Sequence, residues 1–350
     1  MGKEKIKEAE NLFVTDIPHH EEGYNEKDNT IVRLVSNRRN KKPYQVTGIQ
    51  DVAADNNWKA WLYLGPILVL LVVFLIYPLV NTIFISFLDN YDYVNGTYDG
   101  FTFSNFGVIF GITPYNGAYE QNFTTYAIPN TFIIVFLTVP LTTIIALLIS
   151  VALNSIKWFR NALQVVFFLP YVTNMIAVGM VFSVIFDSNG IINYLFNLGE
   201  TAWISGATRA MAFVPLTIYI VWVGLPFKIL IFLSGLQGID KQYYQAAQID
   251  SAPHAKVLWK ITVPLISPQI LYILITSFIG AFKQYTAIVG LFNGAGTIGT
   301  KKNMYTIVYY IYDNLNTHTS FAAAAAVFLF VIIMIFTWLQ FKVSKRRVHY

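Results

Sequence analysis

Six long apolar segments, separated by polar ones, dominate the chain after its first 61 residues. They cover residues of about 62–88, 127–154, 162–186, 209–236, 265–290 and 320–342. Each reaches the roughly 20 residues that a helix needs to cross about 30 Å of hydrocarbon. None shows the alternation of apolar and polar residues that is typical of outer-membrane β-barrels. The pattern therefore predicts an all-α, polytopic membrane protein with six transmembrane helices.

The polar segments define the remaining organisation. Residues 1–61 hold ten Lys or Arg and ten Asp or Glu residues, which predicts a partly disordered extension without the apolar region of a secretory signal. The transmembrane domain covers 62–342, and its longest loop on the same side as the extension is 237–264. Residues 343–350 form a short basic tail.

The distribution of positive charge orients the helices. With the N-terminus in the cytoplasm, 19 of the 24 Lys and Arg residues fall in segments on the cytoplasmic side. The opposite loops 89–126 and 187–208 contain none, and 291–319 contains only Lys301 and Lys302. Because basic residues concentrate in cytoplasmic loops, this asymmetry predicts that both termini and the 237–264 loop face the cytoplasm.

Composition excludes several kinds of function. Charged residues make up 12% of the chain, against about 25% in ordinary soluble domains. The chain has no cysteine and its five histidines are scattered, so we expect no metal site and no catalytic thiol. No Asp or Glu lies within the six segments, which disfavours a proton-coupled carrier or a membrane hydrolase. We therefore expect no catalytic residue in this chain.

Two other polar motifs have simple interpretations. The stretch Gly294–Lys301 superficially resembles a phosphate-binding loop, but Thr300 stands where that motif requires Lys. We therefore expect no ATP and no other cofactor to bind to this chain. The basic cluster at 38–42 is interpreted as a solvated run before a membrane span, without a role in binding nucleic acid.

The 237–264 loop has a distinctive pattern. Asp240 is a good N-cap for a helix that continues to Ile249. Tyr243, Ala246, Ala247 and Asp250 lie at helical spacing, so one face is small and partly apolar. Ser251 and Pro253 end this helix, and a second amphipathic segment leads to Pro264. Two interpretations remain: a helix lying on the membrane surface, or a helix to which a cytoplasmic motor protein docks.

A family resemblance favours the second interpretation. Gln245-Ala246-Ala247-x-x-Asp250-Ser251-Ala252, followed after eight residues by Ile261-Thr262-Val263-Pro264, resembles the "EAA" loop of binding-protein-dependent ABC importer permeases. The family pattern has Glu, Gly and Leu where this chain has Gln245, Ser251 and Val263. Gln245 keeps hydrogen-bonding reach without charge, and Ser251 is strained if the turn needs a positive φ. The resemblance implies that the ATPase-coupling residues are Tyr244, Gln245, Ala246, Ala247, Asp250, Ser251, Ala252, Ile261 and Pro264.

Further motifs are similar to those of the sugar-permease (maltose-type) branch. They include Tyr77-Pro78 in the first segment and Phe168-Leu-Pro170-Tyr171 in the third. The resemblance implies a substrate pathway near mid-membrane, formed by Tyr171, Gly224, Ser277, Lys283 and Gln284. Ile220 and Ala281 are apolar where maltose-type members carry Asn. Lys283 either reaches the membrane surface or a loop carbonyl, or contacts a substrate oxygen or anionic group; Lys228 receives no role.

The resemblance also implies an assembly. This permease would pair with a second related permease, two ATPase subunits and an extracytoplasmic solute-binding protein. It would lie in membrane lipid in the bacterial inner membrane and import a sugar or oligosaccharide, without enzymatic activity of its own. The alternative is a stand-alone secondary carrier or channel for a small polar solute.

Overall fold

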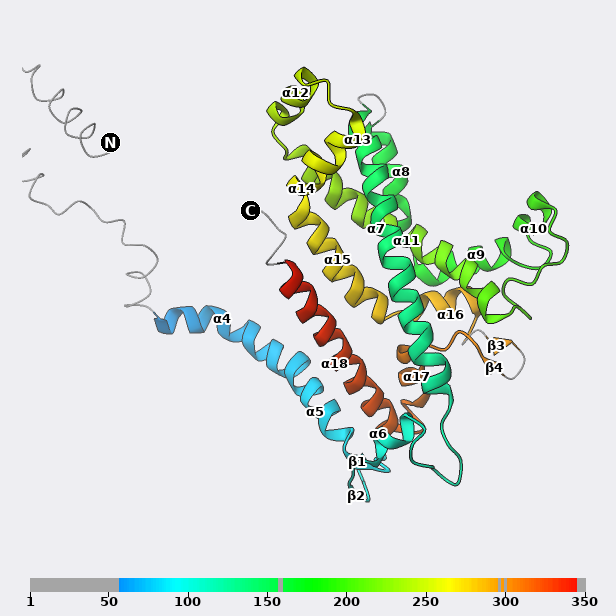
Figure 1. Cartoon of the computed structure of the whole chain (residues 1–350). Helices are drawn as coiled ribbons and strands as arrows, with labels where there is room; N and C mark the ends of the chain where they lie inside the picture. Colours follow the sequence, from blue (N-terminus) through cyan, green and yellow to red (C-terminus); the bar gives the residue numbers. More distant parts are fainter. Residues whose placement is uncertain (1–56, 157–159, 295–296, 299–300, 345–350) are drawn as a thin grey trace, which may run out of the picture. The chain divides into compact units, whose positions relative to one another are not determined.

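A computed structural model describes residues 57–156, 160–294, 297–298 and 301–344 (Figure 1). Most of the predicted N-terminal extension and of the basic tail therefore lies outside the described residues, as does part of the stretch 294–301. The chain divides into two compact units, Met1–Phe74 and Leu75–Tyr350. The substrate pathway and the coupling loop proposed from the sequence both fall in the second unit.

The described part of the first unit is helical, and its side chains from Trp61 onward are exposed. Helix α4 (Asn57–Leu71) leads into the π-helical turn η1 (Val72–Ile76). From Trp61 to Phe74 every side chain is exposed, and most of these side chains are apolar. The helix continues along the chain, so that Trp61–Ile85 forms one apolar helix of 25 residues. This is the pattern of a membrane-spanning helix, whose apolar side chains face lipid or other helices.

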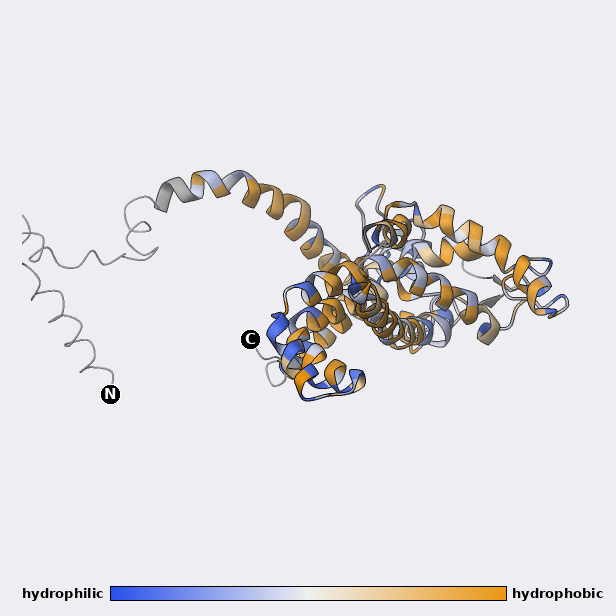
Figure 2. Ribbon diagram, turned by 90° about the horizontal axis from the view of Figure 1, so that it is seen from above, coloured by the Kyte–Doolittle hydropathy of each residue, from blue (hydrophilic) through white to orange (hydrophobic). Residues whose placement is uncertain are grey.

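The second unit consists of helices and two small hairpins. Four helices in the described chain are long and apolar enough to cross a membrane, or five if one bent pair is counted as a single span. The long helices are hydrophobic along most of their length (Figure 2). The elements are α5 (Tyr77–Ile85), β1 (Leu88–Asp89), β2 (Gly100–Phe101), α6 (Ser104–Ile109), η2 (Phe123–Ala127), α7 (Ile128–Ser155), α8 (Arg160–Val172), α9 (Met175–Ile185), α10 (Ile191–Phe196), α11 (Arg209–Gln237), α12 (Lys241–Ile249), α13 (His254–Val257), η3 (Leu258–Thr262), α14 (Val263–Leu265), α15 (Ser267–Phe282), α16 (Thr286–Phe292), β3 (Thr297–Ile298), β4 (Lys301–Lys302), α17 (Ile307–Asn314) and α18 (Thr319–Ser344).

The strands form two antiparallel hairpins in loops. Strand β1 pairs with β2, with Leu88 opposite Phe101, and β3 pairs with β4. Asn105, which is buried in α6, donates to the carbonyls of Ser86 and Leu88 at 3.0 Å and 2.8 Å. These bonds attach the end of α5 and strand β1 to helix α6.

The third predicted segment, 162–186, is not one helix. Helix α8 ends at Val172, two residues after Pro170, and α9 starts at Met175. The Asn174 side-chain oxygen accepts hydrogen bonds from the backbone N–H groups two and three residues later, at 2.9 Å and 3.4 Å. Asn174 therefore caps α9. The prediction of one continuous helix over 162–186 is wrong, because a new helix begins at this cap.

The fifth predicted segment, 265–290, is also interrupted. Helix α15 ends at Phe282 and α16 begins at Thr286. The Thr306 hydroxyl donates to the Gln284 carbonyl at 2.9 Å and so satisfies a backbone group that the break releases from helical bonding. Before α15, the segment His254–Leu265 meets Ser267–Phe282 at a bend of 71°.

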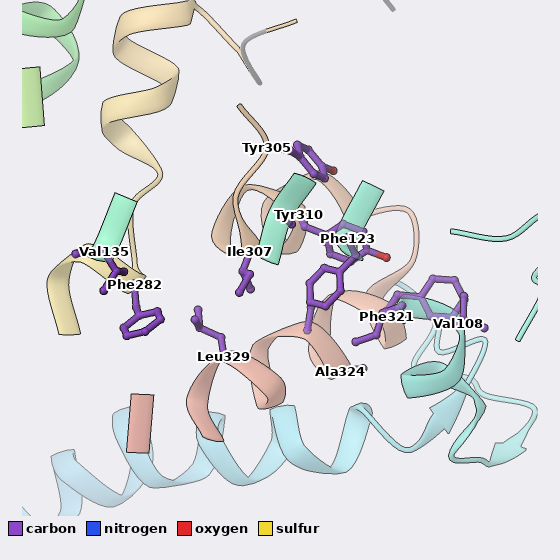
Figure 3. Close-up of a cluster of buried hydrophobic side chains, with 14 of the residues drawn as sticks. Val108, Phe123, Val135, Phe282, Tyr305, Ile307, Tyr310, Phe321, Ala324 and Leu329 are labelled. Atoms are coloured by element: carbon purple, nitrogen blue, oxygen red, sulfur yellow. The ribbon is translucent and has the colours of Figure 1, made fainter. Parts of the chain in front are cut away.

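Four clusters of buried apolar side chains lie in the described part of the second unit, and the smallest joins α5, β1 and α18. The largest joins helices α6, α7, α15, α17 and α18 with η2, and Figure 3 shows Phe123, Tyr310 and Phe321 within it. A second cluster joins α7, α11 and α16 around Tyr219, and a third joins α7, α11 and α15 around Phe232. Helix α7 contributes to these three larger clusters, which makes it the central helix of this unit (Figure 1).

A buried amide links α7 to α11 and to the chain before α17. Asn130 is fully buried and donates to the carbonyls of Asn303 and Tyr305 at 2.7 Å and 2.8 Å. Its side-chain oxygen accepts from the Arg209 Nε at 2.8 Å. Because a buried polar group is costly without partners, these three bonds fix the relative positions of the segments that carry them.

Helices α9 and α16 cross through a pair of glycines. A Cβ atom placed on Gly179 would lie 2.6 Å and 2.8 Å from the backbone of Gly290. A Cβ atom on Gly290 would lie 3.1 Å from the Ile176 Cα atom. The second halves of the two broken segments therefore touch backbone to backbone, which only residues without side chains permit.

Candidate functional site

The first candidate region is the segment between α11 and α15. Helix α12 begins where the sequence predicts, because the Asp240 side chain accepts from the Gln242 N–H at 2.9 Å. The helix ends at Ile249, also as predicted. The Asp240 N-cap is therefore confirmed as the local cause of this short helix.

The turn after α12 requires a left-handed residue. Ser251 has φ of 49°, the Ser251 N–H donates to the Gln248 carbonyl, and the Ala252 N–H donates to the Ala247 carbonyl, both at 3.0 Å. This pair of bonds is a Schellman motif, in which Gly usually occupies the position of Ser251. The turn therefore does need a positive φ at Ser251, as the sequence analysis considered. A residue with a side chain adopts this conformation at some energetic cost.

Ser251→Gly is expected to stabilise the turn. Gly adopts the left-handed conformation without the steric cost that Ser251 has there. The substitution should therefore raise the stability of the folded turn by about 1 kcal/mol. Hydrogen exchange of the Ala252 amide, measured by mass spectrometry on the full-length protein, should then slow by roughly fivefold. Ser251→Ala keeps the strain and is the matched control; equal slowing in both variants would contradict the account.

The second half of the loop is attached to α12 by a buried contact. The hydroxyls of Tyr244 and Thr262 lie 3.2 Å apart, and Thr262 is buried. Thr262 ends η3, directly before α14 and the 71° bend into α15. Displacement of α12 would therefore act on the start of α15 through this contact.

The two alanines of the predicted docking face differ. Ala246 is exposed, whereas Ala247 is 6% exposed and packs within the chain. The expectation that both are presented on one open face is therefore corrected. Tyr243, Ile249 and Trp259 add exposed apolar surface to this region. Of the other predicted loop residues, Gln245, Asp250, Ser251 and Pro264 are exposed, and Tyr244, Ala252 and Ile261 are half-buried.

The second candidate region is a cavity of about 440 Å³ within the second unit. This volume is within the range of about 300–1,000 Å³ that small-molecule sites commonly have. Its walls come from α7, α11 and α15, the end of α8, and the starts of α9 and α16. All five residues of the predicted pathway line it: Tyr171, Gly224, Ser277, Lys283 and Gln284.

Both helix breaks open onto this cavity. Tyr171 and Met175 flank the break between α8 and α9, and Lys283, Gln284 and Thr286 flank the break between α15 and α16. Irregular backbone at membrane depth is tolerated where it lines a cavity. The two interruptions that the hydropathy pattern missed are therefore part of the same site.

The polar groups of the wall fall into two sets. The hydroxyls of Thr138, Thr142 and Thr276 donate to carbonyls of their own helices. Within the part of the chain that the structure describes, Ser277 and Gln284 make no side-chain hydrogen bond, so these groups face the cavity with their bonding capacity free. Tyr171 stacks on Phe227, with ring centroids 5.9 Å apart and planes inclined by 14°.

Lys228 received no role in the sequence analysis, but the structure places it in this site. Lys228 lines the cavity, one helical turn after Gly224, and its ammonium group lies 3.3 Å from the Gly224 carbonyl oxygen. A Cβ atom on Gly224 would lie 3.2 Å from the Lys228 Nζ atom, so the glycine leaves room for this ammonium group. The i to i+4 spacing of the two residues was the available signal. Ile220 and Ala281 line the wall as apolar surface.

The described residues provide no evident metal site. Among them, no group of three or more His, Asp or Glu side chains lies close enough to hold a metal ion. The cavity wall itself contains hydroxyls, an amide and two ammonium groups, and these groups suit a polar organic solute.

Several known proteins are similar in sequence. A probable ABC transporter permease of Mycoplasma pneumoniae is 28% identical over 90% of this chain and 97% of its own length. The lactose transport permease LacF of Rhizobium radiobacter is 26% identical over 82% of this chain and 94% of its own. The arabinooligosaccharide transport permease AraP of Bacillus subtilis is 27% identical over 85% and 92%. Permeases named for sugars are thus among the relatives, as the resemblance predicts.

One solved structure is similar in fold, and one protein family matches in sequence. A crystal structure of a bacterial ABC transporter that imports the acidic polysaccharide alginate shares the fold, with a TM-score of 0.68 at 20% identity, over 85% of this chain and 98% of that one. The family described as "Binding-protein-dependent transport system inner membrane component" matches residues 144–349, more than half of the sequence. With its several apolar spanning helices, the chain is a multi-pass membrane protein and a member of this family of binding-protein-dependent permeases.

Proposed function

We propose that this chain is one permease subunit of an ATP-driven importer. It translocates a sugar or oligosaccharide that an extracytoplasmic binding protein delivers. A second related permease completes the pathway, and two ATPase subunits bind on the cytoplasmic side. The chain itself performs no covalent chemistry and binds no cofactor.

The observation that carries this proposal is the connection between the 237–264 loop, which contains α12, and the cavity. This segment is called the α12 loop below. Helix α15 starts at the 71° bend beside the loop and ends at Phe282, next to Lys283 and Gln284 in the cavity wall. The Tyr244–Thr262 contact joins α12 to the segment before the bend. A helix of 16 residues transmits a displacement over about 24 Å. Movement of α12 by the ATPase would therefore reshape the solute cavity.

A hollow beside α12 offers a place for the ATPase surface. It has a volume of about 490 Å³ and lies between the end of α11, α12 and the start of α15. Asp240, Tyr243 and Gln269 are among the residues that line it. Tyr243 contributes an exposed aromatic ring to this surface, and aromatic side chains are enriched in interface cores.

The six-span topology belongs to the same proposal. Helices α8 and α9 together make the third span, and α15 with α16 make the fifth. The charge asymmetry supports a cytoplasmic position for both termini and for the α12 loop. With this arrangement, α12 faces the ATPase and the loops before α7 and α17 face the binding protein.

The orientation predicts a labelling pattern. The chain has no native cysteine, so single cysteines can be read without background. Lys256→Cys, in the exposed start of α13, should not react with an impermeant thiol reagent added to intact cells, and should react after permeabilisation. Thr317→Cys, on the opposite side, is the control and should react in intact cells. Labelling of Lys256→Cys from outside would overturn the topology.

Uptake measurements test the transport function. Deletion of the gene should abolish ATP-dependent uptake of one class of labelled saccharide among a panel of neutral, carboxylated and phosphorylated sugars. Re-expression of the full-length chain should restore it. Uptake that survives ATP depletion, and depends on this chain alone, would instead support the stand-alone carrier or channel.

A further inference from the structure

The cavity contains two lysines and no acidic residue. Lys228, from the middle of α11, and Lys283, from the end of α15, both line it. Of the described residues in its wall, none is Asp or Glu. In the described part of the chain neither lysine forms an ion pair. Two positive groups thus share one small space without a negative partner.

The position of Lys283 has a local explanation, but that of Lys228 does not. Lys283 is the C-cap residue of α15, where the helix dipole favours positive charge. Lys228 lies well inside α11, and the one hydrogen bond that its ammonium group makes among the described residues is to the Gly224 carbonyl, at 3.3 Å. That carbonyl already accepts the bond of the helix itself. Its ammonium group therefore lacks the partner that a charge at membrane depth normally has.

An anionic solute would supply this partner. We propose that the imported solute carries a carboxylate or phosphate group, which binds between Lys228 and Lys283. This inference rests on the proposed import function and specifies its substrate. A negative charge would form charge-assisted hydrogen bonds with these ammonium groups. A neutral sugar would leave the Lys228 charge without a counter-ion.

The rest of the wall fits the remainder of such a solute. Ser277 and Gln284 offer hydrogen-bonding groups for sugar hydroxyls, and the Tyr171–Phe227 pair offers an apolar ring surface. The names of the relatives leave the charge open, since they include lactose and sn-glycerol 3-phosphate. The two lysines in the cavity wall therefore favour an acidic sugar or a sugar phosphate as the substrate.

A cysteine reporter in the cavity tests the electrostatic argument. Gly280 lines the cavity, and a Cβ atom on it meets nothing within 4 Å, so Gly280→Cys fits without displacement. Its reaction rates with an anionic sulfonate-bearing and a cationic trimethylammonium-bearing methanethiosulfonate reagent are compared in the purified full-length protein with its associated subunits. Replacing both lysines by Gln should lower the anion-to-cation rate ratio by about tenfold or more. Thr317→Cys, outside the cavity, should show no such change.

Protection experiments identify the anionic group. Glucuronate or glucose 6-phosphate should slow alkylation of Gly280→Cys, whereas glucose at the same concentration should not. Protection by glucuronate alone assigns a carboxylate, and protection by glucose 6-phosphate alone assigns a phosphate. Equal protection by glucose, no protection by either anion, an unchanged ratio in the Gln variants, or a Gly280→Cys that reacts with neither reagent would overturn the proposal. None of these readouts depends on ATP hydrolysis, so uptake assays judge the importer function separately.

Discussion

Ala246→Arg is expected to abolish ATP-driven uptake while the protein still inserts and pairs with its partner permease. Ala246 is exposed on α12, so the new side chain does not disturb the chain's own packing. In the complex it would overpack the ATPase interface or bury an unpaired charge there. Such a change costs on the order of 1–3 kcal/mol or more, which weakens the interface by roughly fivefold to more than a hundredfold.

The measurement is the amount of ATPase that co-purifies with this chain, together with uptake by the same cells. Gln248→Arg is the matched control, because Gln248 is exposed on the same helix about 200° around from Ala246. It should retain most of both activities. Full uptake and normal ATPase recovery with Ala246→Arg would show that α12 is a membrane-surface helix only.

Gly179→Leu is expected to disrupt the fold itself. Even its Cβ atom would lie 2.6 Å from the backbone of Gly290, and backbone atoms cannot turn aside as a flexible side chain can. Helices α9 and α16 would have to move apart. The two helix breaks that line the cavity, which directly precede these helices, would then move apart as well. We expect a loss of at least about 1–3 kcal/mol of stability, seen as a lower thermal unfolding midpoint in detergent and poor recovery from membranes.

Gly280→Ala provides the comparison for the glycine crossing. A Cβ atom at Gly280 has no neighbour within 4 Å, and Ala is a better helix former than Gly. This variant should therefore be as stable as the natural protein or slightly more stable. Similar destabilisation of both variants would mean that the close contact of Gly179 with Gly290 is not what holds α9 and α16 together.

Four of the six apolar segments could be read correctly from the sequence as continuous helices. The third and fifth could not, since hydropathy does not report local helix starts. The signals were nevertheless present: Pro170 followed by Asn174 in one, and the polar run Lys283–Gln284 in the other. In both places a polar side chain satisfies or replaces the backbone bonding that the break removes.

In the site, too, the features that depend on neighbouring residues could be predicted from the sequence, and those that depend on tertiary packing could not. The Asp240 cap and the strain at Ser251 follow from neighbouring residues, and the sequence indicated both. The burial of Ala247 depends on how the loop folds against itself, so helical spacing alone misplaced it. Lys228 joins Lys283 only because α11 and α15 meet at the same cavity, and no spacing along the chain predicts that meeting.

Native mass spectrometry of the complex, purified from its own membrane in a mild detergent, tests the central claim most directly. The account predicts one particle that contains this chain, one different permease of the same family and two ATPase subunits. Addition of the solute-binding protein and ATP should then give solute-stimulated hydrolysis in this particle. A particle that contains this chain alone, or only copies of it without an ATPase, would contradict the account.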